Sequence, residues 1–107
     1  MINLDNIEFE DLFVNEDTNE ITLYFKAPRS YLGNKYPDAD YCTISVVYPI
    51  GCQKTSFART YYSPTKEIED RTIDYDVDRV YCYYEFVRML FDIYNDWVKE
   101  NEGETDV

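Results

Sequence analysis

The stretch DRVYCYYEFVRMLFDIYNDWVKEN, residues 78–101, decides the fold. Its apolar side chains recur three and four positions apart, which is the period of an α-helix with one buried face. Asp76 or Asp78 can cap the N-terminus of this helix, and Gly103 follows its end. The pattern therefore predicts one long amphipathic helix over 78–101, about 35 Å in length.

The apolar arc of this helix is unusually wide, roughly 220° of its circumference. One face of a sheet covers less than that, so the arc needs further partners. We expect burial within the monomer, with Tyr83, Tyr84 and Tyr94 in the core. The alternative is a second layer, made by the N-terminal segment, by a homo-oligomer or by a partner surface.

Upstream of the helix, β-forming residues occur in runs separated by turn signals. The runs 7–14 and 20–27 flank NEDTN at 15–19, which predicts a β-hairpin, although the first run also admits a short amphipathic helix. The runs 41–48 and 54–62 flank a second turn. We expect an α+β fold, an antiparallel sheet of about four strands (two hairpins) packed against one long C-terminal helix.

Length and composition set the class of protein. With 107 residues, we expect a single domain over 1–107, ending in a disordered tail at 102–107. Three scattered cysteines favour reduced thiols, and no apolar run is long enough for a membrane span. We expect a cytoplasmic protein, located in the host cell cytoplasm if a phage encodes it.

Histidine is absent from the sequence. Its absence removes the commonest general base, the commonest zinc ligand and every nucleophile pair that uses histidine. We expect no enzyme, no cofactor and no metal. The alternative, a carboxylate site binding magnesium or manganese, would use Asp74, Asp76 and Asp78.

The net charge of −12 is distributed unevenly along the chain. Residues 1–30 carry seven acidic and two basic side chains, 31–63 carry two and three, and 64–107 carry thirteen and five. The acidic blocks thus flank a near-neutral centre. Such a protein repels phosphate, which argues against direct nucleic-acid binding and favours a basic protein surface as partner.

The connector KEIEDRTIDYDVD, residues 66–78, is the most acidic segment. Its end alternates acidic residues, and an extended chain would place those carboxylates on one side, about 6.6 Å apart. That spacing is similar to the spacing of phosphates along a nucleic-acid strand. The plain alternative is a solvated connector with no partner.

Tyrosines offer contact area at low entropic cost, so three of them near the loops complete the predicted interface. The candidate partner-binding residues are Glu67, Glu69, Asp70, Asp74, Tyr75, Asp76, Asp78, Glu8, Glu10, Asp11, Tyr31 and Tyr36.

In size, in tyrosine-rich acidic composition and in the acidic stretch Glu67–Asp78, the chain resembles small inhibitors encoded by phages, the DNA-mimic and type II anti-CRISPR class. This resemblance of style, without a diagnostic motif, implies inhibition of a nucleic-acid-processing enzyme through its basic groove. Two alternatives stay open. One is an immunity protein against a basic nuclease toxin, and the other is a phage assembly subunit that oligomerises through its helix.

Overall fold

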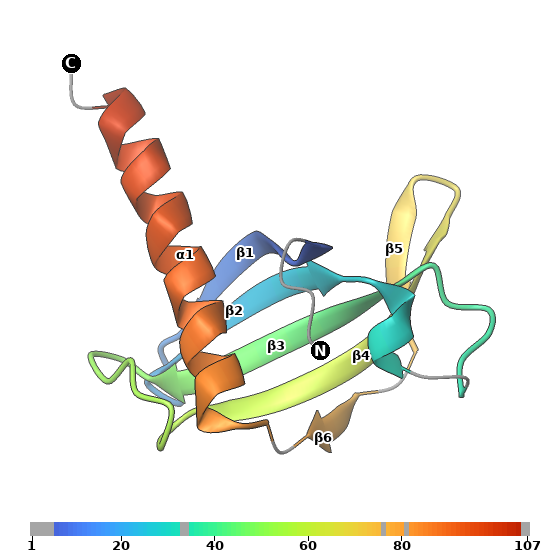
Figure 1. Ribbon diagram of the computed structural model, residues 1–107, viewed down its shortest axis with the longest axis horizontal. Coiled ribbons are helices and arrows are strands. Elements are labelled where there is room, and N and C mark those ends of the chain that lie inside the picture. Colours follow the sequence, from blue (N-terminus) through green and yellow to red (C-terminus); the bar gives the residue numbers. More distant parts are fainter. Residues whose placement is uncertain (1–5, 33–34, 76, 81, 106–107) are drawn as a thin grey trace.

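The chain folds into one antiparallel sheet followed by one long helix (Figure 1). The computed structural model describes residues 6–32, 35–75, 77–80 and 82–105, the side chains of 102–105 excepted. Its elements are β1 (Glu8–Asn15), β2 (Glu20–Ala27), the 3₁₀ turn η2 (Arg29–Leu32), β3 (Tyr41–Pro49), β4 (Arg59–Ile68), β5 (Arg71–Asp74), β6 (Asp78–Val80) and α1 (Tyr84–Thr105). The α+β class is confirmed.

The sheet has six strands within the described residues, so the prediction of about four was too low. The order is β1-β2-β3-β4-β5, and β6 pairs with β4. β5 pairs with residues 65–68 of β4 and β6 with residues 60–62. Residues 66–78, expected to be an acidic connector, thus contain the end of β4, all of β5 and the first residue of β6.

The two faces of the sheet differ because side chains alternate along each strand. Leu23 and Phe25 of β2 and Ile44 and Val46 of β3 are fully buried on one face, which we call the inner face. The inner face packs against α1 in a single core. The helix contributes Phe86, Val87, Leu90 and Phe91 to that core.

The first hairpin is as predicted, and the helical alternative for its first strand is wrong. β1 and β2 pair from Glu8 opposite Lys26 to Asn15 opposite Glu20. The Asn15 side chain accepts hydrogen bonds from the backbone N–H groups of Asp17 and Thr18, at 3.1 and 3.3 Å. This asparagine turn closes the hairpin, as turn-forming residues do.

The second hairpin begins later than the sequence suggests. β4 starts at Arg59, and residues 54–57, predicted as strand, form a turn in which Phe57 N–H donates to the Lys54 carbonyl at 3.1 Å. The preceding turn uses Gly51 at φ 82°, a left-handed conformation that favours glycine. Alternation at 54–58 was therefore no evidence of a strand.

The helix also begins later, at Tyr84 instead of 78. Residues 78–80 are β6, and the Thr60 hydroxyl donates to the Val80 carbonyl. The open edge of β4 thus takes these residues as a strand, and edge pairing overrides their helical spacing. The helix assignment includes 102–105, whereas 106–107 lie outside the described residues, so the disordered tail stays a prediction.

Burial of the whole apolar arc within the monomer was a wrong prediction. Tyr83 is 79% exposed, Tyr84 69% and Met89 39%, while Tyr94 packs against the core as expected. Within the described residues, the last buried side chain on the core-facing stripe of α1 is Phe91. Toward its C-terminus the helix extends past the sheet (Figure 1), and residues 92–101 are exposed or half-buried.

Two neighbouring side chains of α1 test this arrangement. Replacing Leu90, which is fully buried, by alanine should lower the free energy of unfolding by about 2–5 kcal/mol, because a cavity remains in the core. Met89→Ala is the matched control and should cost less than about 1 kcal/mol. Urea unfolding measures both, and equal losses would contradict the described orientation of α1.

Candidate partner-binding surface

The β4–β5 hairpin presents two carboxylates at its tip. Ile68 pairs with Arg71, so the turn contains only Glu69 and Asp70, which have φ values of 49° and 66°. Two left-handed residues form the type I′ turn that suits a two-residue hairpin, but asparagine and glycine normally occupy it. Glutamate and aspartate are strained in this conformation and are both exposed.

The base of this hairpin is held by the loop that precedes β3. Asp40 accepts a hydrogen bond from the Glu67 N–H at 2.9 Å, and its own N–H donates to the Thr65 carbonyl at 2.8 Å. These two bonds fix the point at which the hairpin leaves the sheet. The Glu67 side chain itself is exposed, as are those of Glu69 and Asp70 in the turn.

Asp74, at the end of β5, bonds to two threonines. The Thr65 hydroxyl donates to the Asp74 carboxylate at 2.5 Å, and the Thr43 hydroxyl lies 3.5 Å from the same oxygen. Thr43 and Thr65 are also joined, with 2.5 Å between their hydroxyl oxygens. Part of the hydrogen-bonding capacity of Asp74 is therefore used within the fold.

Asp78, at the start of β6, lies against the loop before β3. Its carboxylate is 3.7 Å from the Lys35 ammonium and accepts a 3.5 Å hydrogen bond from the Tyr36 hydroxyl. Both charged side chains are mostly exposed, and ion pairs of this kind contribute little to stability. Asp78 is thus partly neutralised where it stands.

Strict alternation of Asp74, Asp76 and Asp78 does not give one row of carboxylates. Asp74 of β5 lies opposite Thr65 of β4, and Asp78 of β6 lies opposite Tyr62 of β4. Because Thr65 and Tyr62 are three positions apart on β4, Asp74 and Asp78 lie on opposite faces of the sheet. Asp76 lies outside the described residues.

The N-terminal acids lie on β1, the edge strand of the sheet. Glu8 is opposite Lys26, Glu10 sits at a register shift between Phe9 and Asp11, and all three acids are exposed. The Asp11 carboxylate accepts a hydrogen bond from the Leu12 N–H at 2.8 Å. Charges on an edge strand also prevent edge-to-edge aggregation, which is the purely structural role open to them.

The two acidic groups share one end of the sheet. Glu8 begins β1, and the antiparallel register places it level with the end of β2, the start of β3 and the middle of β4, from which β4 continues into the hairpin on the same side. β1 and β4 are three strand spacings apart, about 15 Å. The projecting β4–β5 hairpin (Figure 1) and the start of β1 therefore bound one acidic end of the molecule.

The three tyrosines predicted to contact a partner lie in different surroundings. Tyr31 is partly buried, because its ring packs on Tyr62 and Phe86 with centroid distances of 6.4 and 6.1 Å and its hydroxyl is buried, so its role in partner binding stays a prediction. Tyr36 and Tyr75 line one cavity of about 420 Å³ beside the loop before β3. Lys35 and Lys66 line it too, so this hollow is not acidic.

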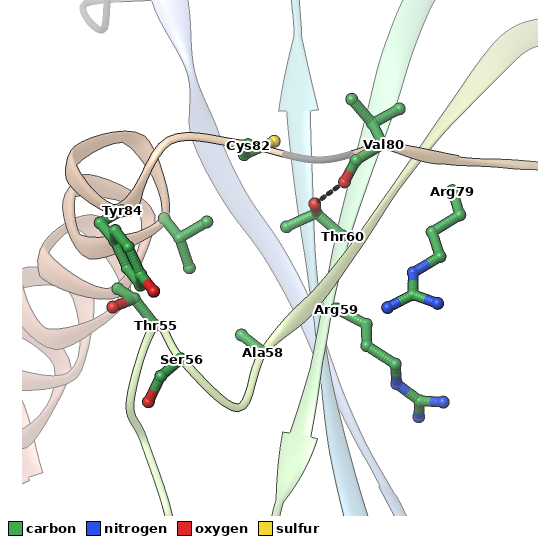
Figure 2. A pocket seen from close by; sticks show the side chains of 10 residues that line it. Thr55, Ser56, Ala58, Arg59, Thr60, Arg79, Val80, Cys82 and Tyr84 are labelled. Atoms are coloured by element: carbon green, nitrogen blue, oxygen red, sulfur yellow. Dashed lines mark hydrogen bonds between the residues drawn. The ribbon is translucent and has the colours of Figure 1, made fainter.

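A second cavity, of about 350 Å³, lies among the 55–58 turn, β6 and the start of α1. Figure 2 shows Arg59 and Arg79 on one side of it and Tyr84 and Cys82 on the other. Arg59 donates to Glu20 at 2.5 Å, and Arg79 also has an interaction partner. Its cations are thus engaged, which gives an anionic ligand little to bind.

Sequence reasoning missed a groove between β1 and the C-terminal half of α1. Phe9, Ile93 and Trp97 line it together with Glu8, Asp96 and Glu100, around a volume of about 430 Å³. Along the helix itself, acidic and basic residues are interleaved. The helix sequence alone cannot reveal that β1 places a further acid, Glu8, beside Asp96 and Glu100.

The chemistry available to the described residues is limited. No group of three or more cysteines and carboxylates among them is placed to hold a metal ion. All three cysteines are free, and burial raises the pKa of the Cys42 thiol to about 12. A thiol with such a pKa is a poor nucleophile at neutral pH.

Comparisons of the chain with protein-family models, with curated proteins and with solved structures find no match. In the part of the chain that the structure describes, no helix combines the length and the apolarity needed to cross a membrane.

Cys42 provides a test of the core through its reactivity. With a pKa of about 12, only about one Cys42 thiol in ten thousand is ionised at pH 8, so alkylation should label Cys52 first and Cys42 only after unfolding. Because the fold favours the neutral thiol, stability should also fall as the pH rises through 9 toward 12. Peptide mass spectrometry measures the labelling, and equal rates at both cysteines would contradict burial of Cys42.

Proposed function

We propose that this protein is an acidic binding protein that inhibits a nucleic-acid-processing enzyme by occupying its basic DNA or RNA groove. The observation that carries the proposal is the β4–β5 hairpin, a narrow two-stranded projection with Glu67, Glu69 and Asp70 at its end. Within the described residues these three carboxylates form no ion pair. They are therefore available to cations of a partner.

Strain at the tip supports a role beyond stability. A type I′ turn made of glutamate and aspartate costs more free energy than one made of asparagine and glycine, by about 1 kcal/mol. Backbone strain of this kind concentrates at functional sites, where the surrounding structure maintains it. The two hydrogen bonds of Asp40 at the hairpin base are such support.

Electrostatics explains how the hairpin would act. A groove that binds nucleic acid is lined by lysines and arginines, which attract phosphates. A projection that carries carboxylates is attracted to the same lysines and arginines. Glu8, Glu10 and Asp11 lie across the sheet from the hairpin, on the edge strand β1, and would meet cations at the rim of that groove. The net charge of −12 speeds the encounter at low salt.

A type II CRISPR nuclease is one enzyme with such a groove, and the resemblance to phage inhibitors favours it. A basic nuclease toxin is the other kind of target, and it would make this chain an immunity protein. Both use the same surface and differ in the identity of the partner. A toxin gene beside the gene for this chain would favour immunity, and phage genes would favour the anti-defence role.

A different function rests on the exposed helix. Tyr83, Tyr84 and Met89 are exposed near the start of α1, and a homo-oligomer could cover them. This arrangement would make the chain an assembly subunit. Sedimentation equilibrium distinguishes the two proposals, because an inhibitor that acts through its hairpin needs no oligomer.

The tip allows function and stability to be separated. Glu69→Asn with Asp70→Gly removes two carboxylates and supplies the residues that a type I′ turn favours. The free energy of unfolding should rise by roughly 1 kcal/mol, while affinity for the enzyme recovered from host lysate should fall roughly tenfold. Urea unfolding and surface plasmon resonance measure the two effects.

The control removes the same charge from the opposite end of the sheet. Glu16→Gln with Asp17→Asn changes two exposed carboxylates of the β1–β2 turn and leaves the Asn15 bonds intact. Affinity should change by less than about threefold, through long-range charge alone. Unchanged affinity in the tip variant, or an equal loss in the control, would refute the hairpin as the binding element.

A further inference from the structure

The groove between β1 and α1 has an aromatic wall. The Phe9 ring lies 4.9 Å from the Trp97 ring, with 57° between their planes, and 5.0 Å from the Tyr94 ring. Trp97 is 43% exposed, although it lies on the core-facing stripe of α1. Contact with Phe9 therefore covers only part of the indole, and the exposed remainder is accessible to an occupant.

Carboxylates surround this wall. Asp96 and Glu100 are one helical turn apart on α1, which puts their Cβ atoms about 5–6 Å from each other, and Glu8 reaches the groove from β1. All three are exposed and form no ion pair in the described part of the chain. Lys26, the cross-strand neighbour of Glu8, instead has its ammonium 4.5 Å from the centre of the Tyr41 ring.

This combination fits one side chain better than others. A guanidinium is planar, stacks on aromatic faces and donates in a fork to carboxylates, whereas an ammonium is a compact and strongly hydrated charge. A groove of about 430 Å³ accommodates a side chain of this size with its backbone outside. A second copy of this chain is a poor occupant, because two molecules of net charge −12 repel each other.

We propose that this groove binds an arginine side chain of the basic partner, which stacks on Trp97 and bonds to the carboxylates of Glu8, Asp96 and Glu100. The inference deepens the proposed function and rests on it for the identity of the partner. It gives the helix a second contact, separate from the hairpin. Arginine is, with tryptophan and tyrosine, enriched among the residues that contribute most of the binding energy at interfaces.

The sequence contains one tryptophan, so Trp97 emission reports directly on the groove. The probe is a tetra-arginine peptide, titrated at low ionic strength against the whole protein. We expect a saturable change in Trp97 emission and no saturable change with the same peptide made of citrulline, which keeps the shape of arginine and lacks its charge. A tetra-lysine peptide should bind at least about threefold more weakly, because an ammonium stacks and forks poorly.

Two variants of equal net charge separate local contacts from long-range attraction. Glu8→Gln, Asp96→Asn and Glu100→Gln together should weaken arginine-peptide binding by about tenfold or more. The matched control, Glu16→Gln, Asp17→Asn and Glu85→Gln, should weaken it by less than about threefold. Circular dichroism verifies that both remain folded.

Several results would overturn this assignment: no saturable emission change with the arginine peptide, equal binding of the lysine peptide, or equal weakening by the two variants. The test needs no partner enzyme, so it stands apart from the hairpin experiment. If the arginine peptide binds but the tip variant keeps its affinity for the enzyme, the proposed function is refuted and the groove assignment stands. If the tip variant loses affinity for the enzyme but the arginine peptide does not bind, the proposed function stands and the groove assignment is refuted.

Discussion

Burial of the inner face of the sheet against α1 is the constraint on which the rest of the structure depends. Leu23, Phe25, Ile44 and Val46 are fully buried there, and Leu90 meets them from the helix. A shift of one residue in any strand would turn these side chains to solvent, so the core fixes the register. The register in turn places the acidic strand β1 at one edge and the β4–β5 hairpin at the other.

The sequence predicted those elements whose local pattern agrees with their tertiary position. Asn15 closes the first hairpin, and helical spacing from Phe86 onward matches the buried stripe of α1. Two of the errors, the low strand count and the early start of the helix, have one cause, which is competition for the edge of β4. Residues 78–80 have helical spacing, yet they complete that edge as β6, because open backbone groups of a strand need partners.

The candidate site was only partly predictable, for similar reasons. The acidic blocks were found from composition, but alternation could not reveal that Asp74 and Asp78 pair with β4 on opposite faces of the sheet. Nothing local distinguishes Tyr31, buried on Phe86, from the exposed Tyr75. Likewise, the left-handed turn at Glu69 and Asp70 follows from pairing of Ile68 with Arg71, which is a property of the sheet.

The central claim is that the acidic end of the sheet occupies a basic groove in place of nucleic acid. Competition tests it most directly, with a fluorescent duplex bound to the nucleic-acid enzyme that the protein captures from host lysate. One equivalent of the protein should release the duplex, so that the anisotropy falls to the value of free DNA, and added salt should weaken this effect. Unchanged or higher anisotropy, or capture of no such enzyme, would contradict the claim.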